Sequence, residues 1–271
     1  MTLRKVLSRY GLTKDPFTKD VPTEELFEHP GTEAAVGRLL AALEGRASSV
    51  VTGEPGTGKT FCIRALEAKL PQGRYRLTYI HNSIVNLRDF YRQLAVALGL
   101  EPRATAEAVF RMVSTQIEEV SQKLHPVLVL DEAHLLSLVV LSQLHVLLNF
   151  HRDSRPLLSL VLVGLSELRD KLTRNVLSSL TARLPVRVHF GPLDAAQTGL
   201  YLRHRLRAAG CTQDVFSEDG VLLLTEATGG VLRKIGTLGW ESLEVACENK
   251  SKLIDAGVVQ DAVKRCGEAL L

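Results

Sequence analysis

The sequence predicts an α/β fold built on a parallel sheet, followed by a smaller domain made only of helices. Short apolar segments alternate with helical segments between residues 48 and 190, which is the pattern of strands joined by crossover helices. After Gly191-Pro192 the remaining segments all have a helical pattern. A chain of 271 residues is long enough for one large domain and one smaller domain.

The expected strands are short and mostly apolar, as in a sheet that helices cover on both faces. They occupy residues 48–52, 76–81, 127–130, 158–163 and 186–190. Amphipathic helices are expected at residues 32–45, 61–70, 87–98, 104–123 and 138–150, and in the second domain at residues 195–209, 219–228 and 231–250. Thr32 is the expected N-cap of the first helix, whereas Gly45 and Gly99 are expected to end the first and third helices.

A Gly-rich turn joins the first strand to the next helix. It contains Gly53-Glu54-Pro55-Gly56-Thr57-Gly58-Lys59-Thr60, followed by Phe61, and this is the pattern G-x-x-x-x-G-K-[ST] in a strand–loop–helix context. Glycines let successive backbone N–H groups approach phosphates, and the helix N-terminus adds partial positive charge. Lys59 is expected to reach the β- and γ-phosphates, and the Thr60 hydroxyl to ligate Mg²⁺. The residues from Gly53 to Phe61 are therefore predicted to bind ATP.

Two carboxylates stand at the end of the third expected strand. Ligands of open parallel sheets bind at this end of the strands, so Asp131 is placed to hold Mg²⁺, through water. Glu132 is expected to polarise the water that attacks the γ-phosphate. His134 follows closely and is assigned no chemistry, because a histidine in such a position more often packs or hydrogen bonds. The pair predicts a Mg²⁺-dependent ATPase.

Phosphoryl transfer also needs cations beyond Mg²⁺ and Lys59, because negative charge spreads over the γ-phosphate oxygens. The candidates lie after the fourth strand and in the helical domain, and they are Arg174, Arg183, Arg187 and Arg233. Taken singly, each has the alternative interpretation of an ordinary surface arginine.

The bulk composition is that of a soluble globular protein, with 45% hydrophobic and 23% charged residues. No apolar run reaches the ~20 residues of a membrane span, and the N-terminus lacks an apolar signal core, so a cytoplasmic protein without a membrane partner is expected. The four cysteines have no metal-type spacing and are expected to be free thiols. A net charge of +3 does not by itself imply nucleic acid.

Further motifs accompany these sites. They are Tyr10-Gly11-Leu12 with Pro16-Phe17, Asp131-Glu132-Ala133-His134-Leu135-Leu136, Leu160-Val161-Leu162-Val163-Gly164 with Glu167-Leu168, Tyr201-Leu202-Arg203-His204-Arg205-Leu206 with Ala209-Gly210, and Gly229-Gly230-Val231-Leu232-Arg233. Together with the Gly-rich turn they resemble the AAA+ ATPases, and within them the ExeA/GspA-like group. The resemblance covers nearly the whole chain. It implies a P-loop NTPase with a three-layer, parallel-sheet core followed by a small all-helical lid domain.

The expected domains are a lead-in segment at residues 1–30, the AAA+ nucleotide-binding domain at residues 31–192, and the lid at residues 193–271. The lead-in segment combines aromatic residues with turn formers, and two interpretations stay open for it. Either it covers the nucleotide base, or Phe17 and Phe27 simply pack onto the core.

The resemblance also implies roles for single residues. Arg183 resembles the finger that reaches the γ-phosphate of a neighbouring subunit, and Arg233 resembles the sensor arginine that acts on nucleotide in its own subunit. Asn82 looks like the residue that restrains the catalytic glutamate in the idle enzyme. Leu165 departs from the group, which often has a glutamine there; Ser166 is the alternative polar contact, and slow hydrolysis is expected.

Short members of this group look like the ATPase partners of DDE transposases, of the MuB, TnsC, TniB and IstB type. The resemblance therefore implies an oligomer, as a ring or a helical filament, that assembles with ATP on duplex DNA and recruits the transposase. Sequence-nonspecific DNA contacts are expected from arginines on or beside the helices after the second strand, although solvated helix faces look the same. These residues are Arg88, Arg92, Arg103 and Arg111.

Two alternatives remain open from the sequence. One is an ATPase that assembles or remodels a protein complex, such as a secretion complex, without binding DNA. The other is a nucleotide switch that does not hydrolyse ATP and uses it only to set an oligomeric state.

Overall fold

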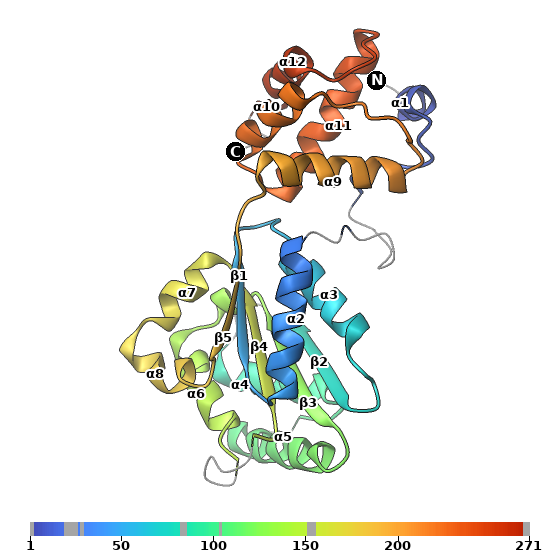
Figure 1. Ribbon diagram of the computed structural model, residues 1–271. Coiled ribbons are helices and arrows are strands. Elements are labelled where there is room, and N and C mark those ends of the chain that lie inside the picture. Colours follow the sequence, from blue (N-terminus) through green and yellow to red (C-terminus); the bar gives the residue numbers. More distant parts are fainter. Residues whose placement is uncertain are drawn as a thin grey trace. The chain divides into compact units, whose positions relative to one another are not determined.

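The computed structural model describes residues 3–18, 27, 30–81, 86–102, 105–150 and 156–267. The chain divides into two compact units, seen in Figure 1 as one unit that holds the sheet and one made of helices. The α/β unit holds residues 31–53 and 59–190. The helical unit holds residues from 191 onward, the N-terminal segment and residues 54–58 of the Gly-rich turn.

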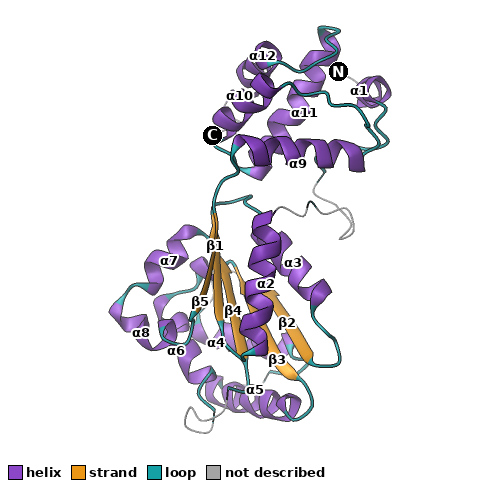
Figure 2. Cartoon of the chain, viewed as in Figure 1, coloured by secondary structure: helices purple, strands orange, loops and turns teal. Residues whose placement is uncertain are grey.

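The α/β unit contains a five-stranded parallel sheet in the order β2-β3-β4-β1-β5, which confirms the predicted fold class (Figure 2). The strands are β1 (Ser49–Gly53), β2 (Tyr75–His81), β3 (His125–Asp131), β4 (Ser159–Gly164) and β5 (Val186–Phe190). The sequence predicts each of them to within two residues at either end. Because the strands are parallel, Gly53, Asp131 and Gly164 all lie at the carboxyl edge of the sheet.

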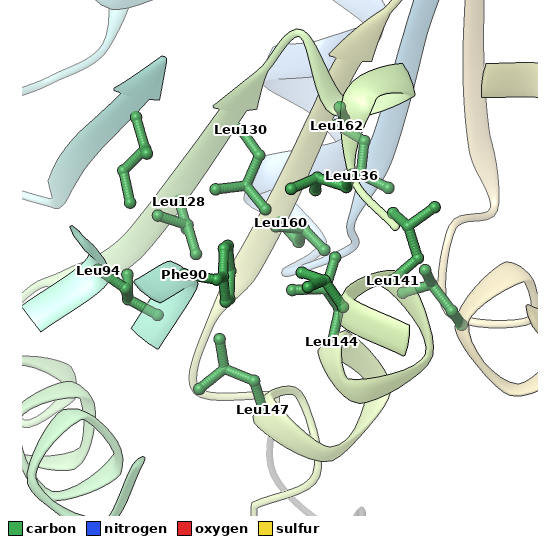
Figure 3. Close-up of a cluster of buried hydrophobic side chains, with 14 of the residues drawn as sticks. Phe90, Leu94, Leu128, Leu130, Leu136, Leu141, Leu144, Leu147, Leu160 and Leu162 are labelled. Carbon is green, nitrogen blue, oxygen red and sulfur yellow. The ribbon is translucent and has the colours of Figure 1, made fainter. Parts of the chain in front are cut away.

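Helices cover both faces of this sheet. One face packs on α4 (Leu87–Ala97), α5 (Ala106–Ser121) and α6 (Leu138–Leu147), and the other packs on α2 (Pro30–Glu44) and α3 (Lys59–Lys69). Side chains alternate along each strand, so Leu128 and Leu130 face the first set, as Figure 3 shows, whereas Val127 and Val129 face the second. This two-sided burial explains why the strands are apolar throughout.

One expected helix end is wrong. The first helix begins at Pro30, so Thr32 is buried inside it and is not the N-cap; proline is well suited to the first turn, where its missing N–H has no partner to lose. The same helix ends at Glu44, directly before Gly45 as expected, and the left-handed residue that follows is Arg46, with φ of 54°. Gly99, with φ of 80°, follows the end of α4 as expected.

Several short elements were not expected from the sequence. In the α/β unit they are the 3₁₀ turns η2 (Ala133–Leu135) and η3 (Asn175–Leu177) and the helices α7 (Ser166–Leu172) and α8 (Ser178–Thr181). In the helical unit they are α1 (Leu3–Tyr10) and α12 (Ala256–Cys266). Each is eleven residues long or shorter, so each offers few periodic positions to a sequence pattern.

The helical unit consists of α1, α9 (Ala195–Ala208), α10 (Glu218–Thr228), α11 (Leu232–Glu248) and α12 around one apolar core. Val6 and Tyr10 of α1 are buried in that core, so the N-terminal segment is part of this unit. The Phe17 side chain packs on α11, where a Cβ atom at Gly239 would lie 2.9 Å from Phe17 Cζ. The Phe27 ring lies 5.6 Å from the Tyr201 ring, between ring centroids. Across the described helices, none is long and apolar enough to cross a membrane.

Candidate nucleotide site

The turn after β1 has the backbone that a phosphate loop requires. Gly56 and Gly58 have φ angles of 79° and 96°, in the left-handed region that side chains with a Cβ rarely adopt. The Thr57 side chain is buried, and its hydroxyl donates a hydrogen bond of 2.9 Å to the Glu54 carbonyl. This bond closes the turn on itself.

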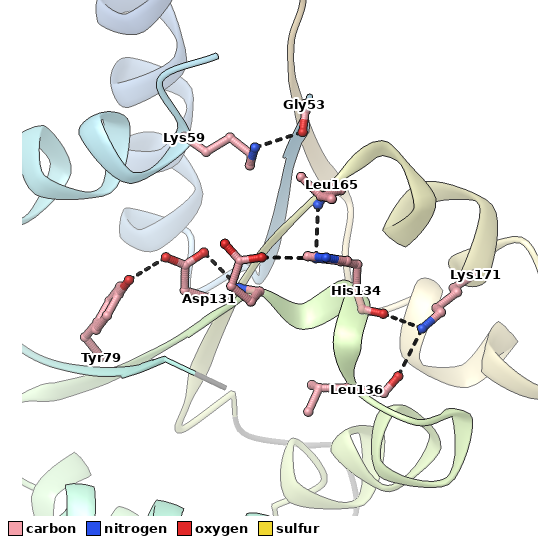
Figure 4. Close-up of polar contacts among 9 residues, drawn as sticks. Gly53, Lys59, Tyr79, Asp131, His134, Leu136, Leu165 and Lys171 are labelled. Atoms are coloured by element: carbon pink, nitrogen blue, oxygen red, sulfur yellow. Dashed lines mark hydrogen bonds and ion pairs between the residues drawn. The ribbon is translucent and has the colours of Figure 1, made fainter. Parts of the chain in front are cut away.

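Lys59 is the first residue of α3, and its side chain is only 7% exposed. Its Nζ donates a hydrogen bond of 2.8 Å to the carbonyl of Gly53, the last residue of β1 (Figure 4). A buried ammonium group at the N-terminus of a helix favours an anion, because both contribute positive potential. Lys59 and the N-terminus of α3 therefore have the charge that suits a polyphosphate.

Asp131 ends β3 and is almost fully buried, and both of its carboxylate oxygens accept hydrogen bonds. Oδ1 accepts from the Glu132 backbone N–H at 2.8 Å, and Oδ2 accepts from the Tyr79 hydroxyl. Tyr79 lies on the neighbouring strand β2, and its pKa is raised, first by burial and then by this hydrogen bond to Asp131. Sequence reasoning missed Tyr79, because only the register of β2 with β3 brings it to Asp131.

Glu132 adopts a left-handed backbone, with φ of 54° and ψ of 31°. A residue with a Cβ in this conformation is strained by roughly 1–3 kcal/mol, and such residues cluster at functional sites. The Glu132 side chain is 34% exposed, and its Oε2 lies 3.5 Å from Nδ1 of His134. The carboxylate is therefore reachable by water on one side and faces an imidazole on the other.

His134 joins this edge of the sheet to the end of β4. Its side chain is buried, and its Nδ1 lies 3.4 Å from the backbone nitrogen of Leu165, which donates to it. Lys171 of α7 donates to the carbonyls of His134 and Leu136, the latter at 3.3 Å. Leu165, the residue after β4, thus makes its polar contact through its backbone N–H rather than through its side chain. Ser166, the alternative polar residue, is the first residue of α7.

The remaining predicted site residues are spread over the chain. Asn82 and Arg103 lie outside the described residues. Arg183 is half-buried after α8, where its Nη1 donates to the Ser179 carbonyl at 2.9 Å. Arg233 lies in the first turn of α11, in the helical unit that also holds residues 54–58. Within that unit, a Cβ atom at Gly56 would lie 2.7 Å from Arg233 Cβ, so only glycine lets the loop pass this arginine.

The arginines expected to contact DNA differ in their surroundings. Arg88 and Arg92 are exposed, four residues apart on α4, and so lie on the same face of that helix. Arg111 is exposed on α5, but its guanidinium forms an ion pair of 2.6 Å with Glu107. Arg88 and Arg92 therefore share one exposed face, whereas Arg111 is engaged by Glu107.

The site as a whole has the chemistry that a Mg²⁺–nucleotide requires. Among the described residues no group of three His, Cys, Asp or Glu side chains could hold a metal alone. Mg²⁺ typically keeps several waters and binds one or two carboxylates together with phosphate oxygens. Asp131 and the exposed Thr60, the second residue of α3, are the side chains that would share it with a bound nucleotide.

The chain is similar to several known proteins. Residues 42–172 match the family described as AAA domain. The chain is 30% identical over 233 residues to general secretion pathway protein A of Aeromonas hydrophila, an alignment that covers 84% of this chain and 42% of that protein. The chain therefore spans less than half the length of this curated relative.

Two solved structures are similar in fold. Cdc6p from Pyrobaculum aerophilum superposes with a TM-score of 0.73 at 22% identity, covering 94% of this chain and 71% of that one. The Aeropyrum pernix ORC1 protein, solved in complex with DNA, gives a TM-score of 0.61 at 21% identity and covers 95% and 69%. The chain has the fold of the AAA+ P-loop ATPases.

Proposed function

We propose that the chain is an oligomeric, ATP-dependent ATPase that binds duplex DNA and regulates or targets DNA transposition by recruiting a DDE transposase. The observation that carries the ATPase part is the arrangement at one edge of the sheet. There the buried Lys59, bound to the Gly53 carbonyl, and the Asp131-Glu132 pair lie at the carboxyl ends of parallel strands.

The proposed chemistry assigns one task to each residue of the site. Lys59 and the backbone N–H groups of residues 56–60 bind the β- and γ-phosphates and neutralise their charge. Thr60 and Asp131 hold Mg²⁺, which lowers the charge on the transferred phosphoryl group. Glu132 accepts a proton from the attacking water.

Three further residues are proposed to control this step. Arg233 acts on nucleotide bound to its own subunit, and Arg183 reaches the γ-phosphate of a neighbouring subunit. Asn82, which follows β2 in sequence, restrains Glu132 in the idle enzyme. Because Arg183 completes a site in another copy, hydrolysis depends on oligomerisation as a ring or a helical filament.

The DNA part of the proposal is supported by exposed cations and by the DNA complex of a protein with the same fold. On α4, Arg88 and Arg92 present two positive charges on one face. Nonspecific DNA binding draws its free energy from such contacts with phosphates and weakens steeply with salt. Arg111 contributes less, because Glu107 already neutralises it.

A second group of cations lies on the helical unit. Arg4 and Lys5 are exposed on α1, and Lys250 and Lys252 are exposed in the turn after α11. Arg9 joins the two segments, since its Nη2 donates to the Ser251 carbonyl at 2.7 Å. Within the parts of the chain that the structure describes, no carboxylate pairs with Arg4, Lys5, Lys250 or Lys252. This surface is the alternative DNA-binding face.

Fluorescence polarisation with a labelled random-sequence duplex tests the DNA part. The chain is titrated with ATP, with ADP and without nucleotide, each over a series of salt concentrations. Tight, salt-sensitive binding only with ATP is the expected result. The double variants Arg88→Glu/Arg92→Glu and Arg4→Glu/Lys5→Glu then show which face is used, with the paired Arg111→Glu as a control. Absence of binding under every nucleotide condition contradicts the DNA role.

A second candidate function is an ATPase that assembles or remodels a protein complex without binding DNA. The similarity to general secretion pathway protein A favours it, over the 42% of that protein that the chain covers. ATP hydrolysis without any DNA binding or DNA stimulation is the result that would select this function over transposition. A direct pull-down of a purified DDE transposase on ATP-bound protein and DNA tests the partner proposed above.

A further inference from the structure

We infer that His134 is a positioning residue for Glu132, and that its Nδ1 couples the catalytic carboxylate to the end of β4. The inference rests on the proposed hydrolysis of ATP and deepens it. It gives an imidazole the polar contact that the resemblance leads one to expect from a side chain after β4, where this chain has Leu165.

The geometry places one nitrogen atom between two partners. His134 Nδ1 lies 3.5 Å from Glu132 Oε2 and 3.4 Å from the Leu165 backbone nitrogen. A ring nitrogen donates when it carries a proton and accepts when it does not. Nδ1 can therefore donate to Glu132 or accept from Leu165, but it cannot do both at once.

This exclusion gives Glu132 two states. When Nδ1 carries a proton, the carboxylate is held against the imidazole, and the Leu165 N–H has lost its acceptor. When Nδ1 carries no proton, the Leu165 N–H occupies it, and Glu132 has lost the partner that orients it towards the attacking water. A shift of the end of β4 that moves the Leu165 N–H away from Nδ1 thus leaves His134 Nδ1 available to the Glu132 carboxylate.

The surroundings fix the imidazole so that this coupling can operate. The His134 side chain is 7% exposed, and Lys171 binds its backbone carbonyl. Gly164, the last residue of β4, lies so close that a Cβ there would stand 3.1 Å from the His134 backbone nitrogen. His134 is therefore held by β4 and by α7, and the proton on Nδ1 determines whether this atom hydrogen bonds to Glu132 or to Leu165.

Two substitutions separate positioning from packing. His134→Leu keeps about the same side-chain volume but removes both ring nitrogens. His134→Asn places an amide near the position of Nδ1, with one oxygen that accepts and one nitrogen that donates. The matched control is His145→Leu on α6. This histidine is half-buried, and the polar contact described for it is with the Ser142 carbonyl of its own helix.

The expected result is a split between binding and turnover. In His134→Leu we expect kcat to fall by about tenfold or more, as is typical when the partner that orients a site group is lost. The Kd for a fluorescent ATP analogue and the Tm should stay near those of the wild-type chain. His134→Asn should recover most of kcat, and His145→Leu should leave it unchanged.

Three results overturn the inference. The first is an unchanged kcat in His134→Leu, and the second is equal loss in His134→Asn and His134→Leu together with a lowered Tm, which shows a packing role only. The third is the absence of phosphate release by the wild-type chain with Mg²⁺ and ATP. That last result contradicts the proposed ATPase itself, whereas the first two leave it standing, so the two failures are distinguished.

Discussion

The Tyr79 hydroxyl donates a hydrogen bond to Asp131 Oδ2, from β2 to the adjacent strand β3. The other oxygen of Asp131 accepts from the Glu132 N–H, so the carboxylate is fixed in one orientation. A carboxylate that both neighbours hold in place is oriented before Mg²⁺ arrives, which lowers the cost of ordering it on binding.

Tyr79→Phe removes this hydrogen bond while it keeps the ring. We expect the Mg²⁺ concentration needed for half-maximal nucleotide binding to rise by about tenfold, the effect typical of losing the partner of a metal ligand. The measurement is a Mg²⁺ titration of fluorescent ATP-analogue binding. Tyr75→Phe on the same strand is the control, because the Tyr75 ring packs edge-on against His125. An unchanged Mg²⁺ requirement would show that Tyr79 has no part in orienting Asp131.

The sequence was sufficient to predict those parts of the structure that depend on residues close together in the chain. The loop from Gly53 to Thr60 and the pair Asp131-Glu132 are contiguous, so their spacing and the flanking apolar segments predict their place at the strand ends. The five strands followed from their apolar composition, because a sheet covered on both faces leaves few polar positions.

Contacts between distant segments could not be predicted in this way. Tyr79 reaches Asp131 across 52 positions, and Leu165 reaches His134 across 31, so both contacts depend on strand register and on how the chain turns after β3 and β4. The helix α1 was missed because Tyr10 stands beside Gly11 in a turn-like context, although Val6 and Tyr10 form a buried stripe.

Lys59→Ala should abolish ATP binding, because it removes the buried ammonium group that neutralises the phosphates. Isothermal titration calorimetry with ATP and Mg²⁺ measures this directly. Lys69→Ala, at the opposite end of the same helix, is the control and should bind as the wild-type chain does. Binding retained by Lys59→Ala would place the nucleotide elsewhere.

Glu132→Gln should keep ATP binding and lose turnover, because an amide of the same shape cannot take a proton from water. A loss of about 10²- to 10⁴-fold in kcat is expected for a general base. Size-exclusion chromatography in ATP should show that the assembled form persists, while the wild-type assembly decays as ATP is consumed. Normal turnover in this variant would assign the base to another residue.

Arg183→Ala should lower turnover by at least about 10³-fold if this arginine acts as a finger on a neighbouring subunit. Nucleotide binding by the monomer should be unaffected, since a finger acts on the nucleotide of a neighbouring subunit. Phosphate release and ATP-analogue binding are measured on the same preparation, with the exposed Arg187→Ala as control. Turnover that is lost only in Arg187→Ala would transfer the role to that residue.

Two glycines of α11 provide a matched test of how the N-terminal segment is held. A Cβ at Gly239 would lie 2.9 Å from Phe17 Cζ, whereas a Cβ at Gly236 would lie at an ordinary 3.4 Å from Phe17 Cβ. Alanine gains up to about 1 kcal/mol over glycine in a helix, but overpacking costs about 1–3 kcal/mol. Gly236→Ala should therefore raise the Tm or leave it unchanged, and Gly239→Ala should lower it. Equal Tm values for the two variants, measured by thermal unfolding, would mean that Phe17 is not seated on this helix in solution.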